Sequence, residues 1–190
     1  TPGNMTFAIQ AAQKTNLVQA IPYLRELVSD RRVFPHHRLE AAKSLGAMAY
    51  DSAVADARRL ISSAESSDSF LERLLAATLL VRQSGEDAET LLLELAMDSQ
   101  PTTAAIAFQR LIELDPRLTQ PVITFASKSS DPKLRTLAGQ ALYLLKTVPD
   151  VVRLSELLSD EHTGVRSRAQ EWLIELDKSA ELSDTVRQSA

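Results

Sequence analysis

The sequence is poor in several features that define other kinds of protein. It contains no cysteine, only 5 glycines in 190 residues and 5% aromatic residues. The lack of cysteine excludes disulfides, thiol nucleophiles and thiolate metal sites. The low glycine content leaves few positions for tight hairpin turns. No apolar run reaches the roughly 18 residues that can span a bilayer, so we expect no membrane insertion.

The charge is nearly balanced and slightly acidic. The chain has 21 basic and 25 acidic residues and a net charge of -4. Such a balance argues against a surface that follows a phosphate backbone, so we expect no nucleic-acid partner. The net charge does not exclude a local basic patch. The sequence does not indicate a cellular compartment. The chain starts at Thr1 without a methionine and ends on an alanine of the motif described next, so we expect a segment of a longer protein.

What the sequence does contain is a helical signature that returns at a nearly constant interval. An alanine is followed four residues later by a leucine, and an arginine usually stands three residues before the alanine. The steps between copies are 35, 31, 31 and 31 residues, which is typical of stacked helical units. The five copies are Arg38-Ala41-Leu45, Arg73-Ala76-Leu80, Ala104-Ala107-Leu111, Arg135-Ala138-Leu142 and Arg166-Ala169-Leu173.

The pattern predicts an all-α chain that forms one domain over residues 1–190. We expect a leading helix in 1–15, five helix pairs in 16–177, and a cap or the start of a further repeat in 178–190. Pro22 and Pro121 fall inside the first helices of two pairs, so those helices should kink or start late. The predicted pairs are 16–29 with 35–49, 52–64 with 68–83, 86–98 with 100–114, 116–128 with 131–146, and 149–158 with 161–176.

The signature places its alanine and leucine on one face of each second helix, because residues four apart lie on the same side of an α-helix. We expect this face to form the core. A small alanine lets neighbouring helices approach closely, and a large residue in its place would overpack the contact.

The segments 130–138 and 159–169 carry Ser-Asp in a turn, followed by Val/Leu-Arg and the alanine at the start of a helix. This arrangement resembles the HEAT-repeat (armadillo-like) family, over roughly residues 16–176. The resemblance implies a right-handed α-α superhelix of about five helix pairs. It also implies that the repeated arginines pair with turn aspartates of adjacent units, with phosphate binding as the alternative. The residues concerned are Arg38, Arg73, Arg135 and Arg166, with Asp131 and Asp160 as partners.

Residues that carry chemistry are scarce. His36 and Glu40 are four residues apart and could face one metal ion, but two ligands do not make a site. HEAT-like metal hydroxylases carry repeated His-Glu pairs. Here His36, His37 and His162 are followed by His, Arg and Thr, so that resemblance fails. We expect no catalytic residue, no metal and no cofactor.

The remaining candidates lie on the second helices. Leu75, Ile106 and Leu137 occupy equivalent positions, where they either pack against a neighbouring helix or form an exposed apolar stripe that marks a partner site. Gln109 and Gln140 would lie alongside, and Trp172 would either pack internally or anchor one end of a partner.

These features predict a non-catalytic scaffold that docks a protein or peptide partner along the groove of the repeat array. The alternative is an enzyme or cofactor handler on the same scaffold, similar to the bilin lyases with HEAT-like repeats. A nucleic-acid enzyme is a weaker alternative, because it would need a basic groove lined with aromatic residues.

Overall fold

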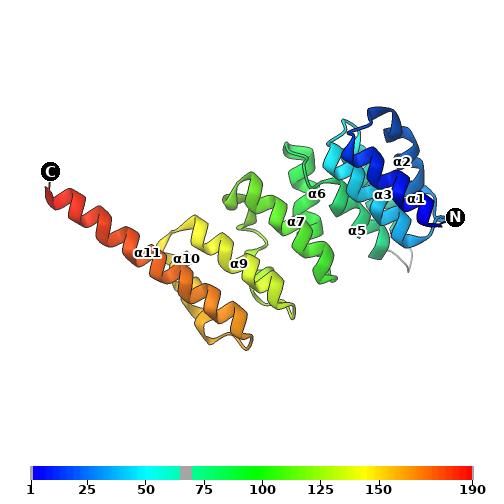
Figure 1. Ribbon diagram of the computed structural model, residues 1–190. Helices are drawn as coiled ribbons and strands as arrows, with labels where there is room; N and C mark the ends of the chain where they lie inside the picture. The colour runs from blue at the N-terminus through cyan, green and yellow to red at the C-terminus, as the bar shows by residue number, and fades with distance from the viewer. Residues whose placement is uncertain (1, 65–69, 190) are drawn as a thin grey trace. The chain divides into compact units, whose positions relative to one another are not determined.

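The computed structural model describes residues 2–64 and 70–189 of the chain, with the side chains of residues 5–64 and 70–179. Helices account for 79% of the structure, and the described ranges contain no strand. The all-α fold class predicted from the repeat is therefore confirmed (Figure 1).

Eleven α-helices and three short 3-10 helices lie in the described ranges. The first seven α-helices are α1 (Pro2–Lys14), α2 (Ile21–Ser29), α3 (Pro35–Met48), α4 (Ala53–Ser63), α5 (Phe70–Leu79), α6 (Glu86–Ala96) and α7 (Pro101–Leu114). The other four are α8 (Ile123–Ser127), α9 (Pro132–Leu145), α10 (Val148–Glu156) and α11 (Thr163–Ser189). The 3-10 helices are η1 (Val18–Ala20), η2 (Pro116–Thr119) and η3 (Leu157–Ser159).

The chain divides into two compact units, Thr1–Leu114 and Asp115–Ala190. In the first unit, α3 packs against α1, α2 and α5, and α5 packs in turn against α4 and α7 (Figure 1). In the second unit, α9 packs against α8, α10 and α11. The second helices of the pairs therefore lie next to one another within each unit. The single-domain organisation over residues 1–190 stays a prediction.

The two prolines inside first helices delay those helices, as predicted. α2 begins at Ile21, with Pro22 in its first turn and η1 before it. α8 begins at Ile123, and residues Pro116–Thr119 before it form η2. Proline is accepted in a first turn because the amide that it lacks would have no partner there.

The last helix is longer than predicted. We expected the fifth second helix to end at residue 176 and a separate element to follow. Instead α11 runs without a break from Thr163 to Ser189. After Gly164 this stretch holds neither glycine nor proline, so nothing in the sequence interrupts the helical hydrogen bonds.

The core follows the repeated signature. All five signature alanines are fully buried, and four of the five signature leucines are buried with them. The fifth, Leu173, is half-buried on α11. Small residues at these contacts allow the backbones of adjacent second helices to approach, which is the role predicted for them.

Candidate functional site

The predicted apolar row is largely part of the core. Leu75 is 0% exposed and Leu137 is 8% exposed, whereas Ile106 is half-buried. Of the two alternatives, packing against a neighbouring helix holds for the two leucines, which therefore form no exposed stripe. α5 and α9 each have helices packed on several sides, so an apolar residue on either helix finds a neighbour instead of solvent.

Gln109 and Trp172 also make contacts within the protein. Gln109 Nε2 donates to Glu113 Oε1 at 3.2 Å, and Gln140 is half-buried. Trp172 is buried and stacks on Tyr143 with their ring centroids 6.0 Å apart. Gly139 lies against the Trp172 ring, because a Cβ at that position would come within 2.8 Å of Cζ3.

The repeated arginines link neighbouring helix pairs, as the structural interpretation predicts. Arg135 donates from Nε and Nη2 to the two carboxylate oxygens of Asp160, at 2.7 and 2.9 Å. Arg73 bonds the Asp98 carboxylate in the turn before α7, and Arg38 donates to Glu72 Oε1 at 3.2 Å. We call Arg38, Arg73 and Arg135 the arginine ladder. Two-point contact between a guanidinium and a carboxylate fixes their relative orientation.

Two of the predicted ladder residues have other partners. Arg166 donates to the backbone carbonyls of Asp160 and Glu161 instead of to a carboxylate. The Asp131 carboxylate accepts from the backbone N–H of Lys133 and so caps α9. The third copy of the signature has Ala104 in place of arginine, so it offers no guanidinium.

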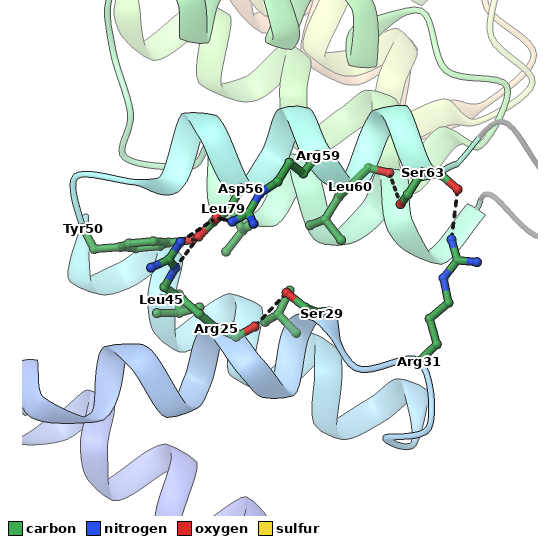
Figure 2. A pocket seen from close by; sticks show the side chains of 11 residues that line it. Arg25, Ser29, Arg31, Leu45, Tyr50, Asp56, Arg59, Leu60, Ser63 and Leu79 are labelled. Carbon is green, nitrogen blue, oxygen red and sulfur yellow. Dashed lines mark hydrogen bonds and ion pairs between the residues drawn. The ribbon is translucent and has the colours of Figure 1, made fainter.

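A pocket of about 430 Å³ lies between two first helices, α2 and α4, and we call it the α2–α4 pocket (Figure 2). This volume lies within the usual range for small-molecule sites. Its apolar floor is supplied by α2, α3, α4 and α5. The floor residues are Val28, Leu45, Leu60 and Leu79, all buried.

One end of the pocket is built around Asp56 of α4. Its carboxylate accepts from Arg25 Nε at 2.6 Å and Nη2 at 2.9 Å, and from the Tyr50 hydroxyl at 2.8 Å. Arg59, one turn along α4, also pairs with it. Figure 2 shows the Arg25 guanidinium reaching across from α2 to this cluster.

Arg31, in the loop after α2, lies at the other end of the pocket (Figure 2). Its Nη2 donates to the Ser63 carbonyl at the end of α4, at 2.9 Å. Its Nε lies 3.3 Å from Glu72 Oε1, the same oxygen that receives Arg38. Helices α2 and α4 are therefore bridged at both ends of the pocket by arginine side chains.

The Asp56 cluster fixes the protonation of its members. Burial opposes ionisation of Asp56, but hydrogen bonds from Arg25, Tyr50 and Arg59 outweigh it, so the pKa of this carboxyl lies below its ordinary value. Burial and the hydrogen bond to Asp56 raise the pKa of Tyr50. At neutral pH the cluster is a carboxylate surrounded by donors, and Tyr50 keeps its proton.

The repeated signature does not point to this pocket, because the signature lies on the second helices and the pocket lies between first helices. One signal was present. Arg25 and Asp56 are 31 residues apart, which is the repeat interval, and Arg31 and Ser63 are 32 residues apart. Oppositely charged residues one repeat apart on successive first helices can face each other across the gap between those helices.

No family model matches the chain, and no curated protein matches it either. One solved structure with a similar fold is that of human deoxyhypusine hydroxylase in complex with glycerol. It is 17% identical in sequence, its TM-score is 0.48, and the match covers 89% of this chain and 77% of that one. The likeness concerns the all-helical repeat fold.

This comparison corrects the functional expectation. The protein with the similar fold is an enzyme. The prediction of a non-catalytic, protein-docking scaffold took binding as the ordinary use of such an array, and that step from fold to function was wrong.

Two further observations concern metals and membranes. Within residues 5–64 and 70–179, whose side chains the structure describes, no group of three or more His, Cys, Asp and Glu side chains could hold a metal ion. None of the described helices is both long enough and apolar enough to cross a membrane.

Proposed function

We propose that this chain is an enzyme or cofactor handler on a HEAT-like scaffold, and that its α2–α4 pocket binds a small organic anion with an apolar body. One observation carries the proposal: two exposed guanidinium groups, from Arg31 and Arg59, stand at the rim of a pocket whose floor is buried leucine and valine. Such a site combines an apolar surface with a few polar groups that fix orientation.

The two rim arginines retain hydrogen-bonding capacity for a ligand. A guanidinium carries five N–H donors. Within the described part of the chain, Arg59 uses only Nη2, toward Asp56, and its side chain is 70% exposed. Arg31 is 56% exposed and directs Nη2 to Ser63 and Nε toward Glu72. Their planar forks suit carboxylate and phosphate groups.

The pocket floor provides an apolar surface for the body of the ligand. Val28 of α2 and Leu60 of α4 keep 2% and 7% of their surface exposed, whereas Leu45 of α3 and Leu79 of α5, which also line the pocket, are fully buried. An apolar ligand body placed on this floor would gain about 25 cal/mol for each Å² that it removes from water. A small inorganic anion would leave the floor unused, so the pocket favours an organic anion.

The test uses decanoate, a carboxylate with an apolar chain, and isothermal titration calorimetry. We expect saturable binding to the unmodified chain. The double variant Arg31→Gln/Arg59→Gln should weaken it at least about tenfold, because hydrogen bonds to charged groups contribute about 1.5–3 kcal/mol. Asp56 keeps Arg25 and Tyr50 as partners in this variant, so the fold should persist.

The matched control is Arg32→Gln/Arg58→Gln, which makes the same charge change at the two neighbouring positions. Arg32 pairs with Asp30 and Arg58 with Asp87, and neither lines the pocket. Decanoate affinity should be unchanged in this control. Equal weakening in both double variants would show that only overall charge matters, and no binding by the unmodified chain would refute the proposal.

A further inference from the structure

The α2–α4 pocket has a surplus of positive charge at each of its two ends. At one end, Arg25 and Arg59 share the single carboxylate of Asp56. At the other end, Arg31 lines the pocket, and its Nε lies 3.3 Å from Oε1 of Glu72; Glu72 itself is outside the pocket lining and also pairs with the buried Arg38. The described residues that line the pocket therefore include three arginines, Arg25, Arg31 and Arg59, and a single carboxylate.

The neighbouring ion pair at the second end does not change this balance. Asp30 and Arg32 pair with each other, with Arg32 Nη2 2.9 Å from Asp30 Oδ2, and so cancel in charge. Of the described residues that line the pocket, Asp56 is the only acidic one. An anionic group is thus attracted to either end.

The two ends are held a fixed distance apart by helix α4. Asp56 marks one end, and Ser63, whose carbonyl accepts from Arg31, marks the other. Seven residues separate them, which corresponds to about 10 Å along an α-helix. Figure 2 shows Arg25 and Arg31 at opposite ends of this helix with Leu60 between them.

The surface between the ends is apolar. Leu60 comes from α4, Leu45 from α3 and Leu79 from α5, and all three are buried. The serine hydroxyls of the lining are already used, since Ser29 donates to the Arg25 carbonyl and Ser63 to the Leu60 carbonyl. The middle of the pocket therefore suits hydrocarbon, and the two ends suit acidic groups.

We propose that the pocket selects a dianion that carries one acidic group at each end of an apolar body about 10 Å long. This inference rests on the proposed function and names the class of its ligand. Arg59, with Arg25 behind it, receives one acidic group, and Arg31 receives the other. The leucine floor excludes ligands that are polar in the middle, because burying an unpaired polar group is costly.

The experiment compares decanedioate with decanoate by isothermal titration calorimetry at fixed ionic strength, because salt screens exposed charges. The two probes have chains of the same length and differ in the second carboxylate. We expect decanedioate to bind about tenfold more tightly, since a second charge-assisted contact is gained. Butanedioate is too short to reach both ends and should bind no better than butanoate.

Single variants locate the effect. In Arg31→Gln and in Arg59→Gln, one end is lost, so the affinity ratio of decanedioate to decanoate should fall close to one. Decanoate itself should bind about twofold more weakly, because one of two alternative positions has gone. The ratio should survive in Arg32→Gln/Arg58→Gln, whose residues lie outside the pocket.

The outcomes separate the two proposals. If neither acid binds, the proposed function is wrong and this inference with it. If both acids bind equally in the unmodified chain, the pocket holds an anion at one end only, and the two-ended ligand is refuted while the proposed function stands. If decanedioate binds more tightly than decanoate but Arg31→Gln leaves that affinity ratio unchanged, the two-ended ligand is also refuted.

Discussion

Gly46 of α3 lies directly against the backbone carbonyl of Thr78 in α5. A Cβ on residue 46 would come well inside van der Waals contact of that oxygen, and close to a methyl group of Val81. The neighbours of these two residues, Leu45 and Leu79, form part of the α2–α4 pocket floor. The close approach of α3 and α5 therefore shapes the floor of the candidate site.

We expect Gly46→Ala to destabilise the protein by about 1–3 kcal/mol, because a backbone carbonyl cannot move without shifting its helix. The loss should appear even though alanine favours a helix by about 1 kcal/mol over glycine. Urea unfolding followed by circular dichroism measures it. Gly139→Ala is the control, because its new methyl group would meet side-chain atoms of Trp172 and Leu157, which can adjust. A larger loss in the control would contradict the argument.

The arginine ladder should contribute to stability. Arg135 and Asp160 have side chains 7% and 6% exposed, so Arg135→Ala leaves a carboxylate poorly solvated. We expect a loss of about 3 kcal/mol in the free energy of unfolding, the lower end of the range for breaking a buried pair. Arg166→Ala should cost less, because Arg166 is half-buried and bonds backbone carbonyls. An unchanged thermal midpoint in Arg135→Ala would refute the structural role.

The repeat made the fold and part of its chemistry predictable. A small residue returning every 31 residues at the same helical face can only serve a contact that also recurs, and Ala107, Ala138 and Ala169 are indeed fully buried. The arginines three residues before Ala138 and Ala169 were predictable for the same reason, because a residue that recurs at one position serves a contact that recurs. The partner was less predictable, since Arg38 pairs with the glutamate of another helix and not with a turn aspartate.

The candidate site was not predictable in the same way. Arg25, Tyr50 and Asp56 are not part of the repeated signature, and they meet because α2 and α4 stand apart above α3 and α5. The width of that gap depends on close contacts such as Gly46 with Thr78, which the helical periodicity does not encode. The position of Leu75 in the sequence left packing and exposure open, and the neighbours of α5 on several sides bury it.

Acidification should weaken the protein through Asp160. The hydrogen bond from Arg135 lowers the pKa of this carboxyl, against the effect of burial. A carboxyl with a lowered pKa in the folded state stabilises above its unfolded pKa, about 3.9, and that contribution disappears as the pH falls through the folded value. The free energy of unfolding should therefore fall as the pH drops from about 5 toward 2.

The variant Asp160→Asn isolates this contribution. It cannot ionise, so its stability should depend less steeply on pH in the same range, although it will be less stable at neutral pH because Arg135 loses its charged partner. Asp115→Asn is the control, since Asp115 pairs with Arg117, whose side chain is 80% exposed. Exposed ion pairs of this kind contribute little to the free energy of unfolding. Identical pH dependence in Asp160→Asn and the unmodified chain would contradict the assignment.

The signature alanine itself offers the most direct test of the repeat. Ala138 is fully buried in α9, which packs against α8, α10 and α11. Ala138→Leu adds three carbon atoms to a contact with no free space, so we expect a loss of about 1–3 kcal/mol by urea unfolding. Trp172, the only tryptophan of the chain, is in the same unit and should report the repacking by fluorescence. Ala55→Leu is the matched control, because Ala55 is exposed on α4 and should tolerate the larger residue. Equal midpoints for Ala138→Leu and the unmodified chain would place the signature alanine outside the core and overturn the packing on which the repeat interpretation depends.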